Sequence, residues 1–349
     1  LASIMESSGA ILDIQTPIGC LRLPADQLGS GQWAGYFGQQ ADLSDLTVTV
    51  EISRTPEEQV RVIENEAEES GYTLVVPPVD FRIIVSDGKL TKEIDVFNTF
   101  VEREIPIPAG IDPSEISTAV VFSGDGTARH VPTAIIQRDG KYYARIMSLT
   151  NSTYGLIKSP KAFSDMEGHW AQDMVNDMAS RRIIFGTGGD KFQPDLAITR
   201  ADFVTLAVRS LGLPEDGKTD AFRDVEEDAG YYGAVAKAYE YGLTEGDGQG
   251  NFNPRKQITR EEAVTVLSRM LKIAGKEVPE GEEGTDSALE KFADRDAISG
   301  WAAAGIAKAA QLGIVEGDAG KFRPKDGITR AETAKIFWKL LNVYGLIES

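Results

Sequence analysis

The sequence predicts a multi-domain α+β protein, in which an N-terminal antiparallel β-sandwich-like module over residues 1–160 precedes an all-α bundle of three repeats. Three observations support this prediction. The 349 residues exceed the usual length of a single domain. Apolar residues alternate with polar ones in the first part, whereas helix-length amphipathic segments recur in the second. A hydrophobic fraction of 42% supplies enough apolar material for both cores.

The alternation expected of strands is clearest in "LTVTVEIS" (46–53), "FRIIVSDGKLTKEIDV" (81–96) and "TAIIQRDGKYYARIMSL" (133–149). Asp-Gly pairs at 87, 125 and 139 separate strand-like runs and indicate hairpins. Prolines at 77, 78, 106 and 108 belong at sheet edges or in loops. We therefore expect an antiparallel sandwich of about eight strands. Its role stays open between a spacer, an assembly domain and a carbohydrate-binding module.

Three motifs recur in the same order from residue 162 onward. Each unit contains Phe-x-Asp, then a glycine-rich loop and Phe-x-Pro, then Thr-Arg at the start of its second helix. The spacing is regular, since 35, 36 and 36 residues separate the Asp from the Arg. The pattern predicts helical repeats over 161–214, 220–274 and 292–349, with an acidic, solvated connector over 275–291. Because one pair of helices cannot bury its apolar face alone, the repeats are expected to pack together.

The second helix of each repeat opens with Ile-Thr-Arg and has an acidic residue three positions after the Thr. Thr-x-x-Glu is a capping box, in which Asp202 is a shorter substitute for Glu in the first repeat. The Arg is not needed for capping, and a cation at this helix end costs up to about 1 kcal/mol. Two interpretations remain open from charge alone. Each Arg pairs with a carboxylate across a repeat interface, or Arg and helix N-terminus together bind an anion.

The order Phe-x-Asp, His-Trp-Ala, Gly-x₄-Phe-x-Pro and Ile-Thr-Arg-Ala-Glu resembles the S-layer homology (SLH) module of bacterial cell-surface proteins, over residues 162–349. The resemblance implies three repeats in a pseudo-threefold bundle with grooves between neighbouring units. It also implies non-covalent, lectin-like binding of a secondary cell-wall polysaccharide, often through a pyruvylated sugar that carries a carboxylate. An extracellular location at the cell wall follows, with self-association in a surface layer (S-layer) as a further expectation.

The resemblance further implies which residues contact an acidic sugar. An Arg forks onto a carboxylate, an Asp accepts hydrogen bonds from hydroxyls, a ring packs on the apolar face of a sugar, and Gly lets backbone donors approach. The second repeat has Gly230, Tyr231 and Tyr232 where the others have Trp, so three equivalent grooves are not expected; the order of preference is the first unit, then the third, then the second. The candidates are Arg200, Arg260, Arg330, Asp165, Asp224, Asp294, Trp170, Trp301, Gly186, Gly246 and Gly317.

Composition argues against several other classes of function. The net charge of −18 disfavours broad nucleic-acid binding and attachment to anionic lipid. The single cysteine, Cys20, excludes an intrachain disulfide and a zinc site built from several thiolates. No apolar run approaches the length of about 20 residues needed to span a bilayer. The loops that begin at Asp247 and Asp318 have Ile258 and Thr329 where an EF-hand needs its acidic ligand, so we predict no metal and no cofactor.

We predict that the chain is not an enzyme, because it contains neither a nucleophile elbow nor a phosphate loop. The carboxylate pairs at 57–58 and 68–69 lie in a polar stretch that is expected to be exposed. The alternative is an anchor and accessory fragment of a surface polysaccharide hydrolase whose β module binds substrate. Trp33, Tyr36 and Phe37 could form a sugar platform in that module, although core or loop packing is the favoured interpretation.

Overall fold

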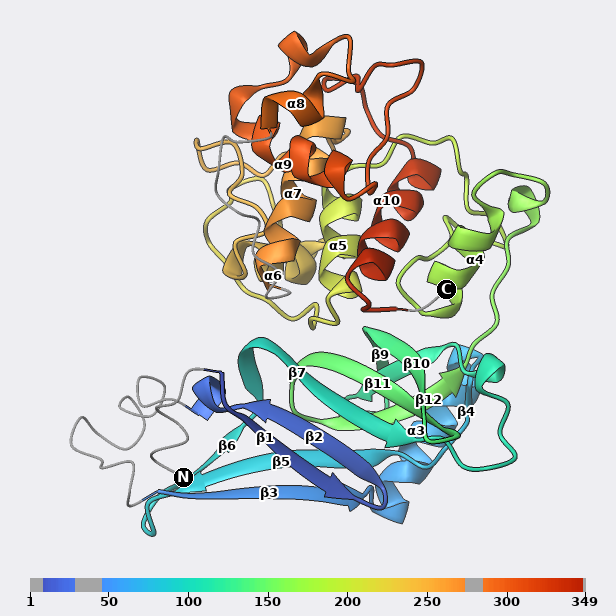
Figure 1. The fold of residues 1–349 in the computed structure, drawn as a ribbon, viewed down its shortest axis with the longest axis vertical. Helices are drawn as coiled ribbons and strands as arrows, with labels where there is room; N and C mark the ends of the chain where they lie inside the picture. The colour runs from blue at the N-terminus through green and yellow to red at the C-terminus, as the bar shows by residue number, and fades with distance from the viewer. Residues whose placement is uncertain (1–8, 29–45, 274–284, 348–349) are drawn as a thin grey trace. The chain divides into compact units, whose positions relative to one another are not determined.

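The computed structural model describes residues 9–28, 46–273 and 285–347. Contacts divide the chain into an N-terminal unit, up to Ser159, and a C-terminal unit, from Pro160 onward. Figure 1 shows all of the strands and the helix α3 in the first unit, and the remaining α-helices in the second. The aromatic residues Trp33, Tyr36 and Phe37 lie outside the described residues, as does most of the expected acidic connector.

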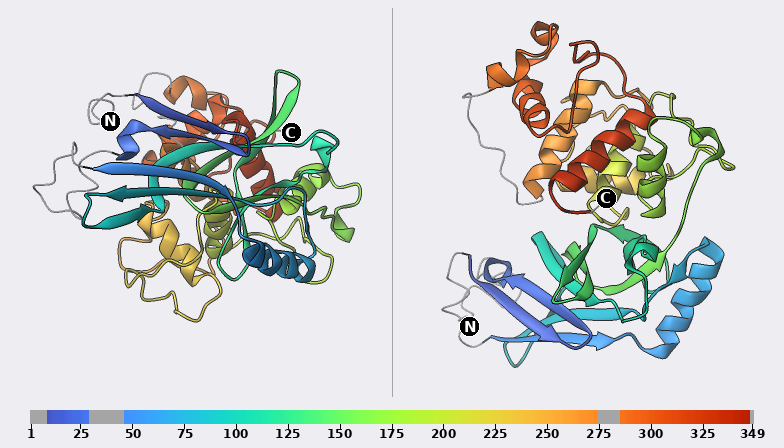
Figure 2. Two further views of the ribbon diagram at one scale, coloured as in Figure 1. Left: turned by 90° about the horizontal axis from the view of Figure 1, so that it is seen from below. Right: turned by 45° about the vertical axis from the view of Figure 1, so that its right-hand side comes forward.

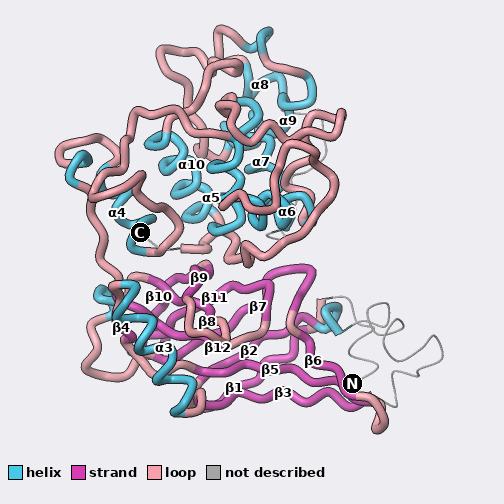
Figure 3. Tube along the Cα trace, turned by 180° about the vertical axis from the view of Figure 1, so that it is seen from behind, coloured by secondary structure: helices cyan, strands magenta, loops and turns pink. Residues whose placement is uncertain are grey.

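The N-terminal unit consists of two sheets, whose strands Figure 3 shows in magenta. Every neighbouring pair of strands in them is antiparallel. The five-stranded sheet has the order β1 (Ile11–Thr16), β2 (Gly19–Pro24), β7 (Val96–Pro106), β11 (Lys141–Thr150), β10 (Thr133–Arg138). The seven-stranded sheet has the order β3 (Thr47–Arg54), β5 (Val79–Ser86), β12 (Thr153–Lys158), β8 (Thr118–Phe122), β9 (Ala128–Val131), with β4 (Thr73–Leu74) on β12 and β6 (Thr91–Ile94) on β5.

The two sheets share one apolar core, so the predicted antiparallel sandwich is confirmed. Leu21 and Val101 from the five-stranded sheet join Phe81 and Leu156 from the seven-stranded sheet in the same buried cluster. The estimate of about eight strands is too low for the described residues, which contain twelve. The additional strands include β4 and β6, and runs of two to four residues are too short to establish a period of two.

All three Asp-Gly pairs lie in hairpin loops, as predicted. Asp139 and Gly140 form the two-residue loop between β10 and β11, with φ values of 52° and 74°. Positive φ at both central positions is the type I′ geometry that matches the twist of a hairpin and favours Gly. The pairs at 87 and 125 belong to the longer loops that join β5 to β6 and β8 to β9.

Residues 57–70 form the helix α3 (Glu57–Ser70), in which the carboxylate pairs at 57–58 and 68–69 are exposed, as expected. The helix buries Ile63 and Ala67 in a second cluster with Val120 and Phe122 of β8. Because Ala119 and Val121 of the same strand belong to the central core, α3 covers the outer face of the seven-stranded sheet. Two apolar residues on one face of an otherwise charged helix, Ile63 and Ala67, are sufficient for this packing.

Arg103 is fully buried in the sandwich, on β7 between the core residues Val101 and Ile105. Its Nη1 donates to the Val101 carbonyl (3.0 Å) and its Nη2 to the side-chain oxygen of Asn151. The guanidinium also lies 5.0–5.8 Å from the ring centres of Phe81, Phe97 and Tyr154. No carboxylate in the described part of the chain pairs with it, and burial lowers its pKa.

The C-terminal unit places a shorter first helix and a longer second helix in each of the first two repeats (Figure 2). The helices are α4 (Gln172–Ser180), α5 (Arg200–Ser210), α6 (Tyr232–Glu240), α7 (Arg260–Ile273), α8 (Thr285–Leu289), α9 (Gly300–Gln311) and α10 (Arg330–Val343). The short helix α8 occupies the end of the segment that we expected to be a connector, and its Leu289 is buried.

The three repeats close into a ring. The backbone N–H of Ile198 donates to the carbonyl of Ile328, that of Ile328 to Ile258, and that of Ile258 back to Ile198, over 3.0–3.3 Å. Helix packing follows the same cycle, since α5 contacts α6, α7 contacts α9 and α10 contacts α4, so each second helix packs on the first helix of the next repeat. This closed cycle is the pseudo-threefold arrangement that the resemblance implies.

Candidate functional site

Each second helix begins at its Arg, and the preceding Thr caps it. The hydroxyls of Thr199, Thr259 and Thr329 accept from the backbone N–H three residues later, over 3.1–3.3 Å. The carboxylates of Glu262 and Glu332 in turn accept from the backbone N–H of Thr259 and Thr329, both at 2.9 Å, which completes two capping boxes. Asp202 instead accepts from the hydroxyl of Thr199 (2.8 Å), so in the first repeat only half of the box forms.

The three arginines reach out of their own repeats and clamp the Phe-x-Pro segment of the next one. The Nε of Arg200, Arg260 and Arg330 donates to the carbonyl of Phe252, Phe322 and Phe192, respectively, over 2.8–2.9 Å. Each guanidinium also lies over the ring of the same Phe, 4.5–5.4 Å from its centre. The unfavourable helix position therefore has a structural use in all three repeats.

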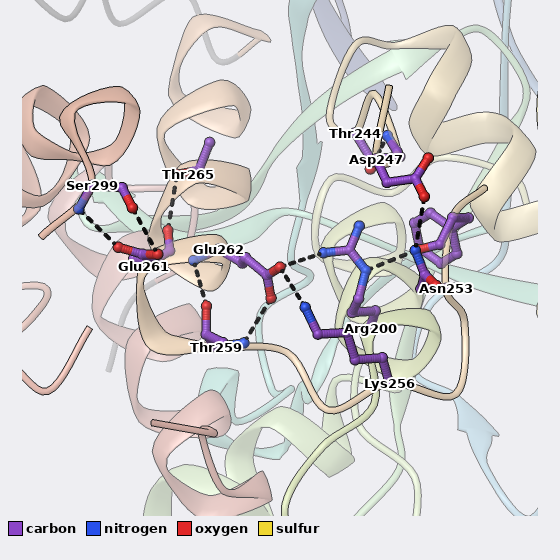
Figure 4. A network of polar contacts seen from close by, with 12 residues as sticks. Arg200, Thr244, Asp247, Asn253, Lys256, Thr259, Glu261, Glu262, Thr265 and Ser299 are labelled. Atoms are coloured by element: carbon purple, nitrogen blue, oxygen red, sulfur yellow. Dashed lines mark hydrogen bonds and ion pairs between the residues drawn. The ribbon is translucent and has the colours of Figure 1, made fainter. Parts of the chain in front are cut away.

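A second contact distinguishes the arginines from one another. Arg200 pairs with Glu262 (Nη1–Oε1, 3.3 Å) and Arg260 pairs with Glu332 (2.9 Å), so the cap residue of the next repeat neutralises each cation. Figure 4 shows Glu262 accepting from Arg200, Lys256 and Thr259 at once. Arg330 has no carboxylate within 4.0 Å among the described residues. Its Nη2 donates to the carbonyl of Phe185 (2.8 Å). The interpretation of the arginines as partners in salt bridges between repeats therefore holds for Arg200 and Arg260 but not for Arg330.

The Phe-x-Asp aspartates hold the Phe-x-Pro segment of their own repeat. The two carboxylate oxygens of Asp294 accept from the backbone N–H groups of Phe322 and Arg323, both at 2.8 Å. Arg323 has a φ of 57°, a left-handed conformation that is costly for a residue other than Gly. Asp165 and Asp224 make the same pair of bonds in their repeats, and none of these aspartates lines the three grooves that contain Arg200, Arg260 and Arg330.

The loop glycines are required by close packing. A Cβ on Gly186, Gly246 or Gly317 would lie 2.6–2.9 Å from a backbone carbonyl oxygen across its own loop and no more than 3.0 Å from the ring of the Phe-x-Asp phenylalanine. Contacts this short do not occur for real side chains, so the loop must contain Gly here. The same three residues line the grooves described next.

Three grooves lie around the ring, and we name each after its arginine. Every groove takes its Arg from one repeat, its Gly from the next and its aromatic ring from the third, so no groove is built from a single repeat. Trp170 and Trp301 are 56% and 60% exposed, so their faces are open to a ligand. The Arg200 groove (about 300 Å³) has Gly246 and Trp301, the Arg260 groove (about 620 Å³) has Gly317 and Trp170, and the Arg330 groove (about 360 Å³) has Gly186 and Tyr231.

Residues outside the repeated motifs complete the grooves, and the sequence pattern did not identify them. Lys335 lies in the Arg260 groove, where Glu316 accepts from it (2.8 Å) and from Lys339 (2.7 Å). These two bonds lower the pKa of Glu316 to about 2. Arg209 lies in the Arg330 groove over the ring of Phe185 and pairs with Glu215. Because these side chains differ between repeats, no periodicity marks them.

The described residues contain no cluster of three His, Cys, Asp or Glu side chains suited to a metal ion. In the loop considered as a calcium site, Asp247 accepts from the backbone N–H groups of Gln249 and Asn251 and from the Asn251 side chain, and these bonds lower its pKa to about 2. No helix within the described ranges is long and apolar enough to cross a membrane.

Comparison with known proteins identifies the repeated region. A family described as the S-layer homology domain matches residues 162–204, 221–264 and 291–334. An amylopullulanase of Thermoanaerobacterium thermosulfurigenes is 35% identical over 197 residues, which is 56% of this chain and 10% of that protein. The exoglucanase XynX of Acetivibrio thermocellus is 34% identical over 201 residues, 57% of this chain and 17% of that protein.

A surface-layer protein of 125 kDa from Lysinibacillus sphaericus is 32% identical over 179 residues, which is 50% of this chain and 14% of that protein. This chain therefore spans less than a fifth of the length of each of these three relatives.

Proposed function

We propose that the chain, in which residues 162–204, 221–264 and 291–334 are S-layer homology domains, holds a surface protein to the bacterial cell wall by lectin-like, non-covalent binding of a secondary cell-wall polysaccharide. The domain family and the surface-layer relative indicate a cell-surface location in association with the wall. The finer part of the proposal is the ligand: a polysaccharide with an acidic sugar, such as a pyruvylated one, that enters the grooves between repeats.

One observation carries this proposal. Each groove surrounds its cavity with a guanidinium at a helix N-terminus, a Gly loop and an aromatic side chain, and these come from three different repeats. A sugar ring can stack on the aromatic face, while its hydroxyl or carboxylate oxygens accept from Arg and from backbone N–H groups. No nucleophile or pair of converging acids is needed for this task, and the domain acts as an anchor without changing its ligand.

Co-sedimentation with purified cell walls of Lysinibacillus sphaericus and Acetivibrio thermocellus tests the proposal. We expect the whole chain to sediment with at least one of these walls, and to stay in solution when the non-peptidoglycan polysaccharide has first been extracted with acid. A variant with Arg200, Arg260 and Arg330 all replaced by Gln keeps an amide donor but loses three charges, so we expect at least tenfold weaker binding. Equal sedimentation with extracted and intact walls would contradict the proposal.

A second candidate is that the chain anchors a surface polysaccharide hydrolase and that its N-terminal unit binds the substrate. The observation that favours it is the similarity to the amylopullulanase and to the exoglucanase, which extends only through the SLH region. A panel of soluble starch, cellulose and xylan fragments, applied to the variant with all three arginines replaced, would isolate binding by the N-terminal unit. Absence of binding to every fragment would rule out this role for the unit.

A further inference from the structure

We propose that the Arg330 groove alone accepts the carboxylate of an acidic sugar in this protein, and that residue 202 makes it different from the other two grooves. This inference rests on the proposed function and refines it, since it assigns the charged part of the ligand to one of three similar grooves.

The acidic residue of the capping box in the next repeat, three positions after the Thr, determines whether each Arg is already neutralised. Glu262 and Glu332 extend far enough to complete their own capping box and to reach Arg200 and Arg260 at 3.3 and 2.9 Å. The equivalent residue facing Arg330 is Asp202, which is one methylene shorter. It accepts from the hydroxyl of Thr199 instead and forms no ion pair with Arg330.

Arg330 is consequently held in place while one nitrogen of its guanidinium makes no hydrogen bond to the described residues. Its Nε and Nη2 donate to the carbonyls of Phe192 and Phe185, and its plane lies over the Phe192 ring. Within the described part of the chain, Nη1 makes no hydrogen bond. The side chain is half-buried, and its loss of solvation lowers its pKa against the opposing effect of Asp202 and Asp165. A fixed, partly desolvated cation of this kind is prepared to bind an anion.

The remaining charges of the grooves favour the same assignment. Two cationic side chains, Arg209 and Arg330, and one carboxylate line the Arg330 groove; Arg209 is paired with Glu215, so Arg330 is the lining cation there that has no carboxylate partner among the described residues. The Arg200 groove has two of each, and the Arg260 groove has four cations against five carboxylates. We expect the Arg200 and Arg260 grooves to bind uncharged sugar units against the faces of Trp301 and Trp170.

The probes for this inference are a methyl hexoside that carries a pyruvate ketal and the methyl ester of the same compound. Titrations of the whole chain are followed by protein NMR, which reports affinity and the groove whose resonances shift. We expect the acid to shift residues of the Arg330 groove and to bind at least tenfold more tightly than the ester. Arg330→Gln should remove this preference, whereas Arg260→Gln should retain it.

The sharper variant is Asp202→Glu. It lengthens the cap residue to match Glu262 and Glu332, so it should complete the capping box, pair with Arg330 and weaken binding of the acid by about tenfold. Its melting temperature should be equal to or higher than that of the wild type, which separates closure of the groove from unfolding. The reverse change, Glu332→Asp, frees Arg260 and should create a second groove that prefers the acid.

Three outcomes would overturn the inference. One is a preference for the acid that survives Arg330→Gln and disappears with Arg200→Gln or Arg260→Gln. Another is unchanged affinity for the acid in a folded Asp202→Glu variant. The third is equal affinity for acid and ester in the wild type. In each case the proposed anchoring would stand if the chain still sedimented with intact walls and not with extracted ones.

Discussion

Replacement of Asp294 by Ala is expected to lower the free energy of unfolding of the C-terminal unit by about 2–3 kcal/mol, because two backbone N–H groups lose their acceptor together. These groups belong to Phe322 and Arg323, and the second is held in a left-handed conformation. Urea denaturation followed by circular dichroism measures the change. The prediction assigns the Phe-x-Asp carboxylate to loop support, whereas the family resemblance implied a contact with sugar.

Asp296→Ala is the matched control, since that side chain is fully exposed and should change stability by less than about 0.5 kcal/mol. The pH dependence of the free energy of unfolding gives a second readout. Burial opposes ionisation of Asp294, but the two backbone donors outweigh it and its pKa lies below the ordinary value. The stabilisation is therefore complete above the unfolded pKa of about 4 and is lost as the pH falls through the folded pKa. A stable Asp294→Ala variant that failed to bind polysaccharide would contradict this assignment.

Arg103→Ala is expected to destabilise the N-terminal unit by about 3–4 kcal/mol. Substitution leaves a cavity between the rings of Phe81, Phe97 and Tyr154, because the long side chain fills the space between the two sheets. It also removes the donor to the Asn151 side chain, which is itself buried. Thermal and urea unfolding of the whole chain, with a probe specific to the β-sheet signal, measure the effect.

Arg82→Ala is the control for Arg103, because Arg82 is half-exposed and pairs only with the exposed residues Glu51 and Glu93. A surface pair of this kind contributes about 0–1 kcal/mol. Arg103→Met should fall between the two variants, since Met restores most of the packing without the hydrogen bonds. If Arg103→Ala cost no more than Arg82→Ala, the guanidinium would not be a supporting element of the core.

Local features of the fold were readable from the sequence. The Asp-Gly hairpins and the capped second helices depend on contacts within a few residues, and the three repeats are marked by motifs that recur in order; all are confirmed. Two features of the fold that were not predicted were also present in the sequence pattern. Val60, Ile63 and Ala67 have helical spacing within the polar stretch that forms α3. Arg103 shares its strand face with Val101 and Ile105, so the alternation already pointed it inward.

The residues that line each groove could not be predicted from local sequence patterns. Arg330 clamps Phe192, which lies 138 residues earlier, and only closure of the ring brings the two together. The aspartates show a different limit: a carboxylate suits a sugar hydroxyl and a backbone N–H equally well, and only the position of the Phe-x-Pro loop distinguishes these partners. Asp202 was recognised as a short cap residue, but its consequence for Arg330 depends on geometry across the interface between the first and third repeats.

We propose that the repeats recognise an acidic wall polysaccharide by pairing its carboxylate with an arginine in a groove. Calorimetric titration of the whole chain with a purified wall-polysaccharide fragment, before and after mild acid has removed its pyruvate ketals, separates binding that depends on the carboxylate from all other binding. We predict tight binding of the intact fragment and at least tenfold weaker binding of the treated one. Equal affinity for both fragments would contradict the claim and would leave the arginines as clamps between repeats.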